Sequence, residues 1–229
     1  MTPPVLPQDT RTRLLESAIL HFAAKGFDGT GIREIAKSAN ANSALVAYHF
    51  CGKEGLYQEV LKAIFARKPC AVAELAEIPP AGTPGARKAA LRGFQDYIRA
   101  FFQELMSSTG SEDPVGEAAM ILMAREMQSP RAASVPLLME QIKPYVTNLT
   151  NCLQVLRPDL DEEALFSMGV SIQGQIIHFR NSLGIIRLIR GNPAYPEDIE
   201  RVVQHHIDFS LRGLGVPEAF PQPRIQPCS

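Results

Sequence analysis

The sequence lacks the features that would place it in a membrane or mark a common catalytic site. None of its apolar runs approaches the ~18–20 residues that a membrane-spanning helix needs. The first ten residues lack the basic and apolar stretches of a secretory signal, so we expect a cytoplasmic protein with no membrane contact. The chain has no glycine-rich phosphate loop, no His-x-x-x-His pair and no nucleophile elbow. We therefore do not expect an enzyme.

Cysteine is scarce and scattered. The four cysteines form no Cys-x-x-Cys pair, which makes a disulfide framework or a zinc site a poor interpretation. His205 and His206 are adjacent, and on a helix they would point about 100° apart rather than toward one metal ion. We expect reduced thiols and no metal or other cofactor.

The chain also carries almost no net charge. Its 23 Lys+Arg and 24 Asp+Glu leave a charge of -1, which argues against a polybasic nucleic-acid binder. The balance is uneven, because residues 1–68 hold nine basic and six acidic groups, and the other 161 residues carry -4. A positive excess at one end is a reason to look for a nucleic-acid site there.

Apolar residues recur at three- and four-residue spacing throughout, which predicts an all-α fold. The segment 78–85 holds three prolines and two glycines, so no helix continues through it. We expect one domain over 8–68, a second, helical domain over 69–214, and a disordered tail over 215–229. Later breaks predict helices near 86–106, 115–128, 137–156, 162–189 and 197–213.

The N-terminal domain has the pattern of three helices with a helix-turn-helix motif over 31–50. Asp9 or Thr10 can cap the first helix, and Gly26 stands where a left-handed C-cap is needed. Asn40 tolerates a left-handed turn, and Asn42 is a good N-cap for the last short helix.

That last short helix has a defined outward face. If Val46 points to the core, Phe50 lies about 40° away, whereas Ala44 and Tyr48 lie about 160° away and point outward. Small residues let a helix approach the floor of a groove, and a tyrosine can touch a thymine methyl group or bind a phosphate. Lys53, at the start of the next helix, is placed for a contact to the DNA backbone.

The segment Asn40-Ala-Asn-Ser-Ala-Leu-Val-Ala-Tyr-His-Phe-Cys-Gly-Lys-Glu-Gly-Leu-Tyr57 resembles the signature of the TetR family of transcriptional regulators. Residues 30–36 and Gly26-Phe27 fit as well, and the resemblance covers about residues 8–68. Arg125-Glu-Met-Gln-Ser-Pro130 and Gly174-Gln-Ile-Ile-His-Phe-Arg180 are similar to the CecR-like subgroup. By this resemblance, the DNA contacts are Thr30, Arg33, Ser43, Ala44, Leu45, Tyr48, His49 and Lys53. Ala47 stands where the family often has a phosphate-binding tyrosine, so Tyr48 or His49 must supply more of the anchoring.

A single helix-turn-helix reads few base pairs, whereas two copies about 34–36 Å apart read a palindrome. We therefore expect a homodimer, as the resemblance also implies. The last two long helices have broad apolar faces, and we expect an interface of Ile172, Ile176, Phe179, Leu183, Val203, Ile207 and Leu211. The other interpretation is that these faces form only the core of one chain.

The middle helices are rich in aromatic residues and methionine, which suit either an ordinary core or an adaptable pocket for a small effector. The pocket interpretation names Phe94, Tyr97, Phe101, Met120, Met123, Met127 and His178. Together with the family resemblance, these patterns predict a homodimeric repressor that a small molecule releases from a palindromic DNA operator. DNA binding is expected in 8–68, and effector binding and dimerisation in 69–214. The alternatives are a helical small-molecule carrier or enzyme, or a protein-interaction scaffold, that retains a helix-turn-helix.

Overall fold

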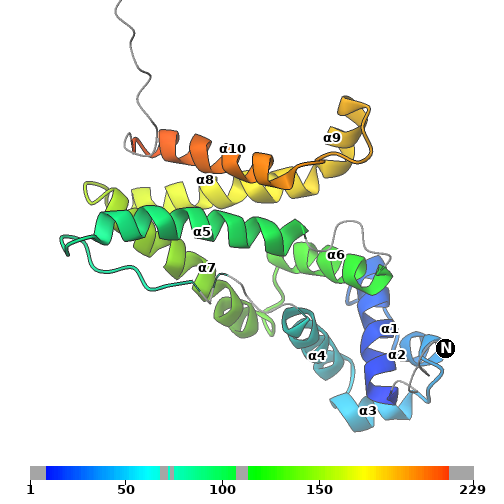
Figure 1. The fold of residues 1–229 in the computed structure, drawn as a ribbon. Helices are drawn as coiled ribbons and strands as arrows, with labels where there is room; N and C mark the ends of the chain where they lie inside the picture. The colour runs from blue at the N-terminus through cyan, green and yellow to red at the C-terminus, as the bar shows by residue number, and fades with distance from the viewer. Residues whose placement is uncertain (1–8, 68–71, 73–74, 107–112, 217–229) are drawn as a thin grey trace, which may run out of the picture. The chain divides into compact units, whose positions relative to one another are not determined.

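The structure is a computed structural model that describes residues 9–67, 72, 75–106 and 113–216 (Figure 1). The regular structure in these residues is entirely helical, which confirms the predicted all-α fold. The helices are α1 (Thr10–Lys25), α2 (Ile32–Ser38), α3 (Ala44–Phe50), α4 (Lys53–Ala66), α5 (Ala86–Met106), α6 (Pro114–Gln128), α7 (Val135–Leu156), α8 (Glu162–Asn181), α9 (Leu183–Arg190) and α10 (Ile199–Gly213). All but the first two residues of the tail expected over 215–229 lie outside the described residues.

These helices pack as two compact units. The first unit holds α1–α4, α6 and α7 up to Gln141, and the second holds α5, the rest of α7, and α8–α10. The first unit thus includes a segment beyond the 8–68 expected for the DNA-binding domain. The reason is that α6 buries Ala118, Ala119 and Leu122 in one core with residues of α1. The division of DNA binding and effector binding at 68/69 stays a prediction.

The first unit is built on α1, whose apolar stripe is buried as the periodicity predicts. The carboxylate of Asp9 caps the helix, since its Oδ1 accepts the N–H of Thr12 at 3.1 Å. The helix ends at Gly26 with φ +72°, a conformation that favours glycine. The buried stripe comprises Leu14, Leu15, Ala18, Ile19, Phe22 and Ala23.

In the second unit α5, α8 and α10 lie side by side (Figure 1). Their facing sides, together with part of α7, bury one apolar cluster that includes Phe94, Ile98 and Phe102 of α5. Burial of such side chains is the main term that stabilises this arrangement.

Two expectations about the later helices need comment. The prediction of one helix over 162–189 is wrong, because α8 ends at Asn181 and α9 begins at Leu183. Ser182 stands between them with φ -91° and ψ 1°, outside helical geometry, and serine competes for nearby backbone groups. The predicted helix over 137–156 corresponds to α7, which continues through Pro144. Within the described residues, no helix is both long and apolar enough to cross a membrane.

Candidate nucleic-acid interface

The turn between α2 and α3 is fixed by two asparagines. Asn40 has φ +49°, the left-handed conformation that the sequence predicts, and the N–H of the next residue, Ala41, returns to the carbonyl of Ala36 at 2.9 Å. Asn42 Oδ1 accepts the N–H of Ala44 at 2.8 Å, at the start of α3. Asparagine is favoured at both kinds of position, so the angle between α2 and α3 follows from local chemistry.

The two faces of α3 differ as the 100° geometry predicts. Val46 and Phe50 are buried in the first unit, whereas Ala44, Ala47 and Tyr48 are exposed. Tyr48 is 80% exposed, and its ring meets that of His49 edge-on with centroids 4.9 Å apart. A large aromatic side chain with its hydroxyl in solvent, flanked by alanines, is suited to enter a groove and touch its floor.

The junction from α3 to α4 demands glycine. Gly52 has φ +104°, and a Cβ on Gly55 would lie 1.8 Å from the carbonyl oxygen of Phe50. This close approach brings the start of α4 against the end of α3. It places Lys53 in the first turn of α4, with its Nζ 4.4 Å from the ring centroid of Phe27.

Most of the predicted DNA contacts lie together on this part of the first unit. Arg33 is exposed on α2, and Lys53 begins α4. The others belong to α3 or directly precede it, namely Ser43, Ala44, Leu45, Tyr48 and His49.

Thr30 is the exception, and its assignment as a DNA contact needs correction. It is 2% exposed, and its hydroxyl donates to the carbonyls of Gly26 at 2.7 Å and His21 at 3.1 Å. His21 lies in the last turns of α1, and Gly26 directly follows the helix, where backbone acceptors lack helical partners. Thr30 therefore closes the end of α1 and has no free polar group for a phosphate.

The residues predicted to bind an effector do not come together within either unit. Phe94, Tyr97 and Phe101 are buried in the core of the second unit, where Tyr97 accepts a hydrogen bond from Gln173 at 2.6 Å. His178 is exposed on α8. The methionines Met120, Met123 and Met127 belong to α6 in the first unit. Helical periodicity finds buried residues well, but it does not say which helices will face one another.

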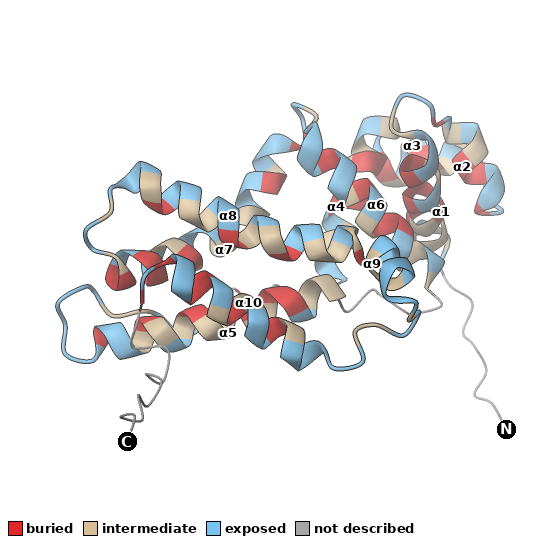
Figure 2. Cartoon of the chain, turned by 90° about the horizontal axis from the view of Figure 1, so that it is seen from above, coloured by how far each residue is buried: buried red, intermediate tan, exposed pale blue. Residues whose placement is uncertain are grey.

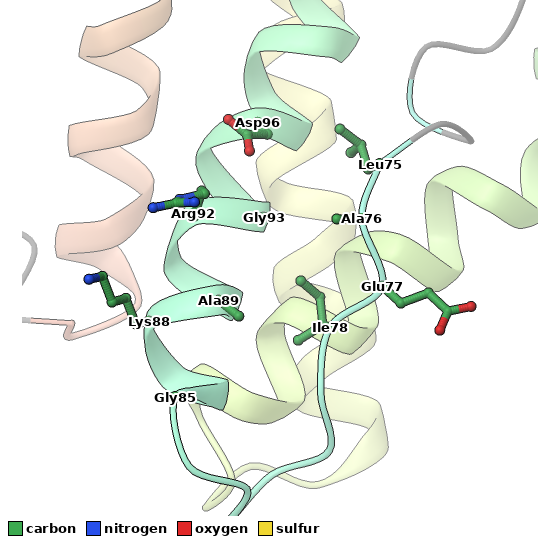
Figure 3. Close-up of a pocket in the computed structure, with 10 residues that line it drawn as sticks. All are labelled: Leu75, Ala76, Glu77, Ile78, Gly85, Lys88, Ala89, Arg92, Gly93 and Asp96. Carbon is green, nitrogen blue, oxygen red and sulfur yellow. The ribbon is translucent and has the colours of Figure 1, made fainter.

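The second unit does contain an apolar groove, which the sequence reasoning missed (Figure 3). Its volume is about 300 Å³, and its walls are the extended segment 75–78 and the first half of α5. Lys88 and Arg92 project from α5 away from that segment (Figure 3). Gly93 forms the floor, because a Cβ there would lie 2.5 Å from Ile78 Cδ1.

A thiol lies close to this floor. A Cβ on Gly93 would lie 3.3 Å from the Sγ of Cys152. Burial raises the pKa of Cys152 to about 12, so the thiol stays protonated near neutral pH. Cys152 therefore acts as an apolar packing residue here.

The residues predicted for the dimer interface are already covered by their own chain. Phe179 is half-buried, with its ring 5.8 Å from that of Phe102 and 5.7 Å from that of His206. Five others are buried in the core of the second unit, namely Ile172, Ile176, Val203, Ile207 and Leu211. Leu183, at the start of α9, is 3% exposed. A side chain in such a core has little surface to offer a second copy, which corrects this assignment.

Other apolar residues of the second unit stay exposed on α8 and α10, and both helices carry exposed stretches in Figure 2. Phe166, Val170 and Ile177 are 57%, 52% and 42% exposed, and at 100° per residue they lie within about 40° of one another on α8. Phe209 of α10 is also 57% exposed. The spacing i, i+4, i+11 on α8 was visible in the sequence, but the helix has apolar residues on most sides, which hid the outer row.

Two family models match the chain. The model of bacterial regulatory proteins of the tetR family matches residues 14–60, which contain the helix-turn-helix described above. The model of the C-terminal domain of the HTH-type transcriptional dual regulator CecR matches residues 94–214, more than half of the chain. The chain belongs to the TetR family of transcriptional regulators. This confirms the resemblance of its N-terminal part and the CecR-like character of its C-terminal part.

Curated relatives match the chain over short stretches. The probable HTH-type transcriptional regulator YttP of Bacillus subtilis (strain 168) is 45% identical over 56 residues, which are 24% of this chain and 27% of the relative. The biofilm operon icaADBC HTH-type negative transcriptional regulator IcaR of Staphylococcus aureus (strain Newman) is 38% identical over 55 residues, 24% of this chain and 30% of the relative. The chain thus spans less than a third of the length of these relatives. Like the family, they are regulators of transcription and not enzymes.

Solved structures share the fold over nearly the whole chain. A putative transcriptional regulator from Pseudomonas aeruginosa PAO1 aligns with 95% of this chain and 96% of its own, with a TM-score of 0.58 and 19% identity. NalD, the secondary repressor of the MexAB-OprM multidrug efflux pump in Pseudomonas aeruginosa, aligns with 89% of this chain and 94% of its own, with a TM-score of 0.59 and 18% identity. At this level of identity the likeness concerns the TetR-family fold alone.

Proposed function

We propose that this TetR-family regulator is a homodimeric repressor that binds a palindromic operator through α3 and is released by a small effector. The observation that carries the proposal is the outward face of α3. There an 80% exposed tyrosine stands among exposed alanines, with Lys53 at the start of the next helix. Residues 8–68 read the DNA in this proposal, and residues 69–214 bind the effector and the second copy. The protein acts where the DNA is, in the cytoplasm.

Contacts to DNA divide into two kinds. Tyr48 and Ala44 face the bases in the major groove, whereas Lys53 and Arg33 neutralise phosphates. The ammonium of Lys53 lies over the ring of Phe27 and, among the described residues, forms no ion pair with a carboxylate. Phosphate contacts make the affinity depend on salt, with a slope of about -0.9 per neutralised phosphate.

The homodimer uses the exposed apolar face of the second unit. Phe166, Val170 and Ile177 of α8, with Phe209 of α10, would be covered when the same helices of a second copy pack on them. Gly174 lies beside this row and has no heavy atom within 4 Å of its Cβ position, so a partner helix can approach closely. This face replaces the interface expected from the sequence.

The effector enters the second unit. The groove between segment 75–78 and α5 is the opening that supports this part of the proposal, and its apolar walls favour a small apolar molecule. Release requires that the effector bind the DNA-competent and the released dimer unequally. A coupling of about 1–3 kcal/mol changes operator affinity about 5–150-fold.

The proposal is tested by selecting bound duplexes from a random library with the purified full chain. We expect a palindromic consensus, binding as a dimer, and an affinity that falls steeply as salt rises. Equal affinity for the selected and random duplexes would refute the repressor. A clean monomer at micromolar concentration in sedimentation would refute the homodimer. An added thermal-shift screen of small apolar compounds identifies effectors, and a true effector must also weaken operator binding.

A further inference from the structure

Two positive charges share one aromatic ring in the first unit. The centroid of Phe27 lies 4.4 Å from Lys53 Nζ and 3.7 Å from Arg131 Cζ. Lys53 belongs to the proposed DNA interface, whereas Arg131 lies in the turn between α6 and α7, outside the helix-turn-helix. The ring therefore brings a proposed phosphate contact next to a cation that is 78 positions away in the sequence.

A buried carboxylate keeps Arg131 in this place. Glu126 of α6 is 3% exposed, and its Oε1 accepts the backbone N–H of Arg131 at 2.9 Å. Its Oε2 accepts the hydroxyl of Tyr57 at 2.5 Å. Burial, together with the hydrogen bond to Glu126, raises the pKa of Tyr57, so the hydroxyl remains a donor. Because a buried carboxylate is costly without donors, these groups hold one another.

The side chain of Arg131 also reaches the first turn of α4. Its Nη2 donates to Glu54 Oε2 at 3.3 Å, and Glu54 directly follows Lys53 in the chain. Arg131 thus pairs with the carboxylate of Glu54, which would otherwise attract the ammonium of Lys53, while the two cations share the ring of Phe27. Repulsion between the two cations favours an outward position of Lys53.

We infer that Arg131 is a positioning residue for DNA binding, which keeps Lys53 available to a phosphate, and that Glu126 is its anchor. This inference rests on the proposed function of the α3–α4 surface. Without Arg131, Glu54 loses its partner and competes with DNA for Lys53. The turn between α6 and α7 therefore sets DNA affinity without touching the DNA.

The test is a double-mutant cycle on the full chain, measured with the selected operator and with a random duplex at low salt. We expect Lys53→Ala to weaken binding about 10-fold and to reduce the salt slope by about one. Arg131→Gln should weaken binding about 5-fold with a similar loss of slope, and the double variant should lose about 10-fold rather than about 50-fold. Arg131→Gln combined with Glu54→Gln should restore the affinity, because the competing carboxylate is then gone.

The matched control is Arg67→Gln, which removes the same charge from an ion pair with Asp113 in the same unit. We expect less than a 2-fold effect from it. Arg131 is partly exposed, so thermal unfolding should show Arg131→Gln folded. If it does not fold, Arg131→Lys combined with Glu54→Gln serves for the cycle.

The outcomes separate the two proposals. A 50-fold loss in the double variant, or no restoration by Glu54→Gln, would overturn the positioning role while leaving the repressor intact. Equal affinity for operator and random duplex would refute the repressor. The double-mutant cycle would then still measure the coupling of Arg131 and Lys53 from the affinity for the random duplex. Absence of binding to either duplex would overturn both.

Discussion

The exposed faces of α3 and α8 carry different chemistry, although both helices bury an apolar stripe on their inner side. The outer face of α3 offers one tyrosine among alanines, whereas that of α8 offers Phe166, Val170 and Ile177 without a hydroxyl. A helix that enters a DNA groove needs small residues and a polar tip, while a helix that packs on protein needs apolar area. The outward face therefore distinguishes the two kinds of partner, and the inward face does not.

The largest expected effects concern the two hydrophobic cores, which should contribute similarly to the stability of their units. Phe22 and Phe94 are both 0% exposed, one in each unit. Replacing either with alanine should lower the free energy of unfolding by about 3–5 kcal/mol, because a cavity is left behind. Urea denaturation followed by circular dichroism measures this change. A loss of unfolding free energy below about 1 kcal/mol for either variant would show that the replaced phenylalanine does not lie in a tightly packed core.

The next largest effect concerns the outer face of α8. Phe166→Glu should weaken the homodimer about 30-fold or more, because a charge is then buried at the centre of an apolar contact. Sedimentation over a range of concentrations measures the dimer constant. The matched control is Ser171→Glu, on the same helix but about 140° away, which should change the constant less than about 3-fold. Equal effects of both variants would remove the distinction between α8 and α3.

A smaller effect is expected on the outer face of α3. Tyr48→Ala should weaken operator binding about 10-fold, which corresponds to about 1.4 kcal/mol, and leave the melting temperature unchanged. Fluorescence anisotropy with a labelled operator gives the affinity. Tyr48→Phe sharpens the result, since it retains affinity if the ring touches a base and loses it if the hydroxyl binds a phosphate. A lower melting temperature would contradict the exposed position.

The smallest effect involves protonation in the second unit. Burial lowers the pKa of His206, partly offset by its hydrogen bond to the carbonyl of Val202, and the charge of His205 lowers it further. The unfolded chain therefore takes up this proton first, so the contribution to stability is complete above about pH 6.5 and is lost as the pH falls toward the folded pKa. Unfolding between pH 7.5 and 5.5 should depend less on pH in His206→Gln than in the parent. An unchanged dependence, or a larger one, would contradict this assignment.

Local chemistry explains where sequence reasoning succeeded. Asn40, Asn42 and Gly26 each have a side chain, or lack one, that selects a backbone conformation within a few residues, and the turns they predict are present. The outward position of Tyr48 likewise follows from helix geometry once Val46 is placed inside.

Tertiary packing explains where it failed. In the sequence, Thr30 resembles an exposed threonine just before a helix. In the structure its hydroxyl donates to backbone carbonyls at the end of α1. Ile176 and Ile177 are adjacent and equally apolar, yet only the first is buried, because α5 and α10 cover one side of α8. The sequence could not connect Arg131 with Lys53. Both cations meet at the ring of Phe27, and the carboxylate of Glu126 holds the backbone of Arg131.

The floor of the groove in the second unit has a practical consequence. Ile78 can lie against α5 because residue 93 ends in a hydrogen atom where any other amino acid has a carbon. The atom it would meet is the tip of a flexible side chain, so an alanine at 93 asks for a small shift rather than a rebuilt backbone. An added methyl group would displace the side chain of Ile78, and would thus reshape the floor of the groove without altering charge. Gly93→Ala is therefore a way to test the proposed effector groove while the surface of α3 keeps its own residues.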